Sequence, residues 1–140
     1  MSVVGVVVVL AVLAAATAYG VWWRRRSGRL RRTDETELLR ADVVGVGVEL
    51  GERATLLQFS SAFCRPCVAT RHVLGGVAGA VPGVRHVEID AESNLDLVRR
   101  LSVMSTPTTL LLDRDGVVRR RATGVPRREA VLAALSDVVD

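Results

Sequence analysis

The strongest structural signal in this sequence lies in residues 54–67, which read ATLLQFSSAFCRPC. Residues 54–60 form a short apolar run that is typical of a buried strand. Two cysteines follow, Cys64 and Cys67, and a helical pattern begins at about the second of them. The cysteine pair is therefore expected at the point where a strand passes into a helix.

Downstream of the cysteine pair, helical and strand patterns alternate to the end of the chain. Helices are predicted at about residues 67–80, 95–101 and 127–139, and strands at 84–90, 108–113 and 117–124, with a hairpin turn at 114–116. Weaker patterns favour a short helix beginning within 33–37 and an edge strand and turn within 42–53. The order of the elements predicts an α/β fold, a mixed sheet of four to five strands with helices on both faces.

The position of Cys64 at the start of a helix favours thiol chemistry. Unpaired N–H groups at a helix N-terminus carry partial positive charge, which stabilises a thiolate. We therefore expect Cys64 to be the nucleophile and Cys67, one turn later, to resolve the mixed disulfide. Arg65 adds a positive charge beside Cys64, and Pro66 is tolerated because an N–H is not needed in the first helical turn.

An apolar segment at the N-terminus predicts a membrane anchor. Residues 3–23 contain no charged side chain, and as a helix these 21 residues would span about 31 Å, close to the ~30 Å of a bilayer core. Tyr19, Trp22 and Trp23 lie at one end, where aromatic rings favour the headgroup level. A cleaved secretory signal is the alternative, since residues 14–18 could imitate a cleavage site, but no basic region precedes the apolar stretch.

Basic residues directly after the apolar segment predict its orientation. Arginine-rich flanks stay in the cytoplasm, so the C-terminal domain is expected in the cytosol of a single-pass membrane protein, with an extracytoplasmic domain as the alternative. The flank would lie along anionic headgroups. Without these six residues the chain holds 13 Arg against 15 acidic residues, and with few aromatics this argues against nucleic-acid binding. The six are Arg24, Arg25, Arg26, Arg29, Arg31 and Arg32.

A static disulfide and a zinc site are the alternatives to redox chemistry at the cysteine pair. The cytosol keeps ordinary thiols reduced, which argues against a static disulfide. Structural zinc takes four ligands, whereas the only other Cys or His residues in the chain are His72 and His86. The sequence therefore predicts a redox pair and no metal site.

A second motif, Ser105-Thr106-Pro107-Thr108, lies about forty residues after the cysteines and just before a predicted strand. Proline at the start of a central strand is unusual unless it follows a cis bond in a tight bend. Together with residues 58–67, 87–90, 103–108, the turn at 115–116 and Gly124, this motif resembles the thioredoxin superfamily. The resemblance covers about residues 54–138.

The resemblance implies further site residues and a recognition mode. Pro107 would be the family's cis-proline beside the two sulfurs, and Thr106 would offer backbone hydrogen bonds to a substrate strand. Gly124 would be the small residue that lets the substrate approach.

Several positions depart from the family pattern. Phe63 stands where thioredoxins usually have Trp, and Arg65 replaces Gly. Gln58 occupies the position of the buried Asp that accepts the proton of the second cysteine, and His86 falls where a buried Lys is frequent. Gln58 and His86 are thus the candidate proton relay, with a packed or exposed bystander as the alternative for His86. His72 stands where the active-site helix of the family commonly has a kinking Pro, and this change is interpreted as structurally neutral.

These observations predict an anchor over residues 1–23, a basic and polar juxtamembrane linker over 24–41 and a thioredoxin-like domain over 42–140. The predicted function is a membrane-tethered thiol-disulfide oxidoreductase that acts through Cys64-Arg65-Pro66-Cys67, a monomer with no cofactor beyond its redox disulfide. Its expected partners are protein thiols and disulfides, a reductase or other electron donor, and membrane lipid. The alternatives are an extracytoplasmic protein of the cytochrome-maturation type and a non-catalytic docking module.

Overall fold

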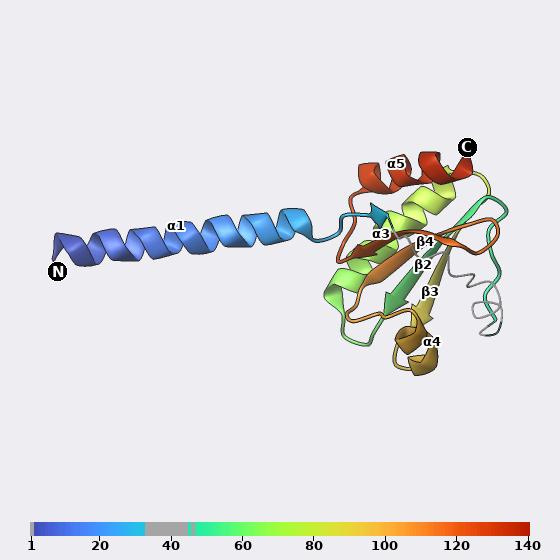
Figure 1. Cartoon of the computed structure of the whole chain (residues 1–140), viewed down its shortest axis with the longest axis horizontal. Helices are drawn as coiled ribbons and strands as arrows, with labels where there is room; N and C mark the ends of the chain where they lie inside the picture. Colours follow the sequence, from blue (N-terminus) through green and yellow to red (C-terminus); the bar gives the residue numbers. More distant parts are fainter. Residues whose placement is uncertain (1, 33–44, 46) are drawn as a thin grey trace.

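The computed structural model describes residues 2–32, 45 and 47–140, and it contains one mixed sheet with helices packed on both faces (Figure 1). The helices are α1 (Val3–Arg26), α3 (Arg65–Ala80), α4 (Leu95–Arg100) and α5 (Arg128–Val139). The strands are β1 (Arg31–Arg32), β2 (Ala54–Ser60), β3 (Val84–Asp90), β4 (Thr108–Asp113) and β5 (Val118–Thr123).

The five strands lie in the order β1-β5-β4-β2-β3. Strands β2 and β3 are parallel, as expected when a helix connects them, and the other neighbours are antiparallel. This arrangement confirms the predicted mixed sheet and the thioredoxin-like fold class.

Strand β2 lies at the centre of the core, and all seven of its residues are buried. Because side chains alternate across a strand, Leu57 and Phe59 pack with Leu97 of α4 on one face, while Leu56 packs with Leu74 of α3 on the other. Gln58 shares the face of Leu56, so this polar side chain points toward α3. The burial of β2 thus fixes the strand that leads into the cysteine pair.

The bounds of β2, β3 and β4 match the predicted ranges, and the other predicted elements differ by one or two residues at their ends. Helix α3 begins at Arg65, two residues earlier than expected. The described residues 47–53 form no strand, which corrects the strand predicted within 42–53. Residues 42–44 and 46, like the helix predicted within 33–37, lie outside the described residues.

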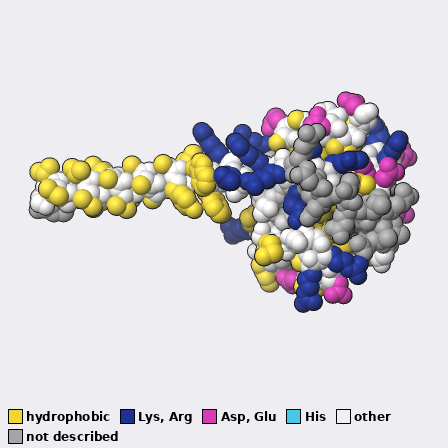
Figure 2. Space-filling model, in the orientation of Figure 1, with side chains coloured by type: hydrophobic (Ala, Val, Ile, Leu, Met, Phe, Trp, Pro, Cys, Tyr) yellow, Lys and Arg dark blue, Asp and Glu magenta, His cyan; other side chains and the backbone are white. Residues whose placement is uncertain are grey.

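Helix α1 projects from the domain and buries none of its residues, and by length and composition it could cross a membrane (Figure 1). It runs three residues beyond Trp23, to Arg26. Its far part is apolar, and basic side chains gather where it meets the domain (Figure 2). The Tyr19 ring lies 5.9 Å from that of Trp22, and the Arg26 guanidinium lies 5.2 Å from the Trp22 ring.

Strand β1, which the sequence did not predict, joins the chain after α1 to the edge of the sheet. Arg31 pairs with Arg121 and Arg32 with Arg120 in antiparallel register. Leu30, the residue before β1, packs against the core cluster beneath α3 and α5. Residues directly after the apolar helix are therefore part of the folded sheet.

Candidate active site

The two cysteines lie at the start of α3 and form a disulfide, with their Cα atoms 5.2 Å apart. Cys64 is the N-cap residue, and its sulfur accepts a hydrogen bond of 3.2 Å from the backbone N–H of Cys67. Cys64 is half-buried, whereas Cys67 is 1% exposed. The Cys64 sulfur is therefore the one that an approaching partner meets, and the Cys67 sulfur lies behind it.

The backbone around the pair has local causes. Pro66 sits in the first turn of α3, where its missing N–H removes no helical bond, and its carbonyl oxygen accepts from Thr70 Oγ1 at 2.9 Å. Phe63 has a φ of 58°, in the left-handed region, and its side chain is fully exposed. The turn thus directs an aromatic ring into solvent directly before Cys64.

A hollow of about 430 Å³ lies beside the sulfurs. It is lined by Ser61, Phe63, Cys64, Arg65, Cys67, Val68 and Arg71. Apolar and basic side chains both border it, so a substrate segment here would meet an aromatic ring and positive charge. Arg65 is exposed at its border.

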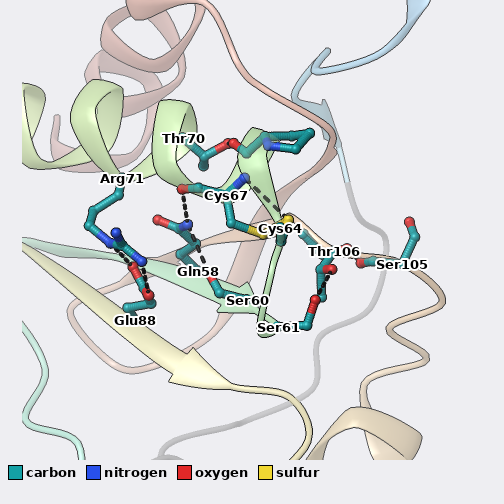
Figure 3. Close-up of a disulfide and its surroundings, with 12 residues drawn as sticks. Gln58, Ser60, Ser61, Cys64, Cys67, Thr70, Arg71, Glu88, Ser105 and Thr106 are labelled. Carbon is teal, nitrogen blue, oxygen red and sulfur yellow. Dashed lines mark hydrogen bonds and ion pairs between the residues drawn. A yellow bond between two sulfur atoms is a disulfide. The ribbon is translucent and has the colours of Figure 1, made fainter.

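The loop before β4 lies against the cysteine loop (Figure 3). Pro107, which the resemblance assigned as a cis-proline, follows a cis peptide bond from Thr106. Thr106 Oγ1 lies 2.8 Å from Ser61 Oγ, which links the two loops through their side chains. The N–H of Gly124 donates to the Pro107 carbonyl oxygen at 2.9 Å. The structure therefore links Thr106 to the loop that carries the cysteines, and Gly124 to the neighbouring Pro107.

Gln58 is fully buried beneath α3 and makes three hydrogen bonds. Its Nε2 donates to Ser60 Oγ and to the carbonyl oxygen of Cys67, both at 2.9 Å (Figure 3). Its Oε1 lies 3.0 Å from His86 Nε2. Because both amide protons are already used, Oε1 must accept, so the Nε2 of His86 carries a proton. The two members of the candidate relay are in direct contact.

An ion pair between α3 and β3 lies next to His86. Arg71 donates from Nε and Nη2 to the two carboxylate oxygens of Glu88, each at 2.6 Å. These hydrogen bonds lower the pKa of Glu88 and raise the pKa of Arg71 above its ordinary value. Burial lowers the pKa of His86; Glu88 opposes this shift and Arg71 adds to it. The imidazole is thus held neutral at physiological pH.

Sequence reasoning missed Ser60, Arg71 and Glu88. Arg71 lies four residues after Cys67 on α3, and this helical spacing was the available signal for a residue on the same face. His72, interpreted as a structurally neutral change, is exposed on α3. Among the described residues, no group of three or more Cys, His, Asp or Glu side chains could hold a metal ion.

Comparison with known proteins finds thioredoxins as relatives of this chain. The chain is 32% identical to a thioredoxin of Mycobacterium tuberculosis (strain H37Rv) over 88 residues, which cover 62% of this chain and 75% of that protein. It is 30% identical to a thioredoxin of Mycolicibacterium smegmatis over 101 residues, or 70% and 85% of the two chains. No family model matches the sequence.

Solved structures resemble the fold. A mutant thioredoxin from Halobacterium salinarum matches with a TM-score of 0.59 at 22% identity, covering 81% of this chain and 95% of that one. The oxidised mitochondrial thioredoxin 3 of Saccharomyces cerevisiae matches with a TM-score of 0.54 at 24% identity, covering 61% and 79%. At these identities the structural matches support the fold alone.

Proposed function

Because this chain belongs to the thioredoxin family and is a thiol-disulfide oxidoreductase, we propose that it exchanges protein disulfides at a membrane surface through Cys64 and Cys67. The observation that carries the proposal is the placement of the two sulfurs. Cys64 caps α3 and is accessible, and Cys67 is buried one turn behind it. A helix N-terminus stabilises the Cys64 thiolate, and Arg65 beside it acts in the same direction.

In the reduced protein, the Cys64 thiolate attacks one sulfur of a substrate disulfide. A mixed disulfide forms, and the other substrate sulfur leaves as a thiolate that takes up a proton. The Cys67 thiolate then attacks Cys64 Sγ, which releases the second substrate sulfur and leaves the protein with its disulfide. Two electrons pass to the substrate, and a dithiol reductant must return them to the protein.

We assign positioning roles to Gln58 and His86. The hydrogen bonds from Gln58 reach the carbonyl oxygen of Cys67 and not its sulfur. A neutral amide is a poor proton carrier, so Gln58 fixes the first turn of α3, and His86 holds the amide in that orientation. The proton of Cys67 is then exchanged with water or with the leaving thiolate.

The substrate would bind across the surface formed by Phe63, Arg65, Pro66, Thr106, Pro107 and Gly124. The exposed ring of Phe63 offers apolar contact, and the backbone at Thr106, in the bend before β4, would offer hydrogen bonds to a substrate strand. Gly124 has a φ of +88°, and a Cβ there would meet Ser27 and Gly28, so its lack of a side chain makes room for these two residues at the border of this surface.

We propose that α1 spans the membrane once and that the domain lies on the cytoplasmic side. The helix is apolar along its length, has aromatic rings at its C-terminal end and carries Arg24, Arg25 and Arg26 in its last turn. These features match a span whose basic flank stays in the cytoplasm. An extracytoplasmic domain would require the same arginines to cross the bilayer.

Reduction of insulin by dithiothreitol, catalysed by the full chain in detergent, tests the chemistry. We expect Cys64→Ser to abolish the acceleration and Cys67→Ser to accumulate mixed disulfides. His72→Ala, an exposed change on α3, is the matched control and should behave as the wild type. If Cys64→Ser keeps wild-type acceleration, the assignment of the nucleophile is wrong.

Extraction of membranes with alkaline carbonate tests the anchor, because a spanning helix keeps the chain in the pellet. A reporter that is active only in the cytoplasm, fused after Asp140, tests on which side of the membrane the domain lies. Release by carbonate would contradict the anchor, and an inactive reporter together with an active extracytoplasmic one would reverse the topology.

A further inference from the structure

The helix proposed to span the membrane is fixed to the domain almost without a spacer. One residue, Ser27, separates the end of α1 from Gly28, whose N–H donates to the carbonyl oxygen of Thr123 at the end of β5. Gly28 is buried with a φ of +78°, and a Cβ there would overlap the Val125 carbonyl oxygen. The contact therefore requires glycine and a close approach of two backbones.

The same segment stays attached beyond Gly28. Leu30 packs against the core, and β1 pairs with β5. We call residues 27–32 the docking segment. Its last two residues form β1 at the edge of the sheet, whereas an unattached chain of the same residues would let the domain move freely beneath α1.

The docking segment reaches the sheet beside the substrate-binding loop. Thr123, which accepts from Gly28, precedes Gly124, and Gly124 donates to Pro107. A Cβ on Gly124 would lie 3.3 Å from the Ser27 Cβ. Pro107 follows Thr106, which contacts Ser61 in the cysteine loop. Figure 1 shows that α3 begins on the side of the domain from which α1 approaches.

These contacts limit how far the active site can stand from the bilayer. If Trp23 lies at the headgroup level, the path to Gly28 adds about 4.5 Å of helix and about 7 Å of extended chain. The headgroup layer itself is roughly 5–8 Å thick. The edge of the sheet at Gly124 therefore lies at or just beyond the headgroups, where Arg24, Arg25 and Arg26 would face anionic lipid (Figure 2).

From this geometry we propose that the substrates are disulfides of integral membrane proteins, placed close to the headgroups on the same side of the bilayer. The inference rests on the proposed function, since it needs both the thiol exchange and the spanning helix. The docking segment sets the height of Cys64 and turns its face toward the membrane. The exchange is the same two-electron step, in which the partner's disulfide becomes a dithiol.

The test uses the full chain in vesicles with anionic lipid, reduced with dithiothreitol and then freed of it. The probes are lipid-linked disulfides on short (~10 Å) and long (~40 Å) flexible spacers. In a single turnover, we expect the short-spacer probe to react roughly fivefold faster, because effective concentration falls steeply with spacer length. Equal rates, or a faster reaction with the long spacer, would overturn the inference.

An insertion variant separates docking from mere attachment. Twelve Gly and Ser residues between Arg26 and Ser27 leave the sheet intact and add an r.m.s. spacing of about 19 Å. We expect the preference for the short spacer to disappear in this variant and to persist when the same insert follows Asp140. An insertion variant that keeps the preference would refute the role of the docking segment.

Two further measurements separate this inference from the proposed function. A chain that fails to sediment with the vesicles, or that no longer reduces insulin, overturns the proposed function and the inference together. A chain that sediments and reduces insulin, yet reacts equally with both probes, overturns the inference alone.

Discussion

Replacement of Gln58 by leucine should destabilise the domain through the hydrogen bonds that hold the first turn of α3. Gln58 is fully buried, so leucine keeps most of the packing but removes two donated bonds and one accepted bond. A buried polar group that loses its partner costs about 1–3 kcal/mol. The carbonyl oxygen of Cys67 also belongs to the helix, and His86 is half-buried. For each group that loses its bond to Gln58, we therefore expect a cost near the lower end of this range. The total loss in free energy of unfolding is about 2–3 kcal/mol.

Urea unfolding of the oxidised full chain in detergent, followed by far-UV circular dichroism, measures this loss. Tryptophan fluorescence would not report on the domain, because both tryptophans, Trp22 and Trp23, lie in α1. With a urea dependence of about 2 kcal/mol/M, the midpoint should fall by about 1–1.5 M. If the urea midpoint decreases by less than about 0.3 M, the idea that these hydrogen bonds hold the site is refuted.

Three further changes have expected outcomes. Thr109 lies opposite Gln58 in the sheet, and its buried Oγ1 has no hydrogen-bond partner among the described residues. Thr109→Val should therefore raise the free energy of unfolding by about 1 kcal/mol. An unchanged or lower value from urea unfolding would contradict this. Because burial lowers the pKa of His86, its contribution to stability is complete above about pH 6.5 and is lost as the pH falls below that value. His86→Gln should therefore show a shallower loss in urea midpoint between about pH 6.5 and 5, and an unchanged slope would count against this role. Phe63→Gly removes a strained left-handed residue, so the urea midpoint should be equal or higher. It also removes an exposed aromatic ring, so the KM for insulin should rise several-fold. A lowered urea midpoint or an unchanged KM would speak against these roles.

Local patterns in the sequence were sufficient for the central strands and for the start of the site. Strands β2 and β4 are short segments with apolar centres, buried on both faces, so their positions follow from composition. Cys64 at a strand–helix junction and Pro107 before a strand are likewise short motifs. Each of these features depends on residues close together in the chain.

Contacts between distant elements could not be predicted in the same way. Strand β1 consists of two arginines and has no strand pattern of its own; it is a strand because the edge of β5 lies beside it. The ion pair of Arg71 with Glu88 depends on how α3 lies on β3. For Gln58 and His86, family positions suggested a shared role, but the structure was needed to show that the amide contacts the carbonyl oxygen of Cys67.

The pairing of β1 with β5 has a consequence for biosynthesis. Arg31 must wait for Arg121, which is made 90 residues later. At 5–20 residues per second, this interval is about 5–20 s. The nascent edge strand stays unpaired for that time, and its two guanidinium groups disfavour aggregation with strands of other chains. The first strand of the sheet in chain order is thus paired only when the last one, β5, has been translated.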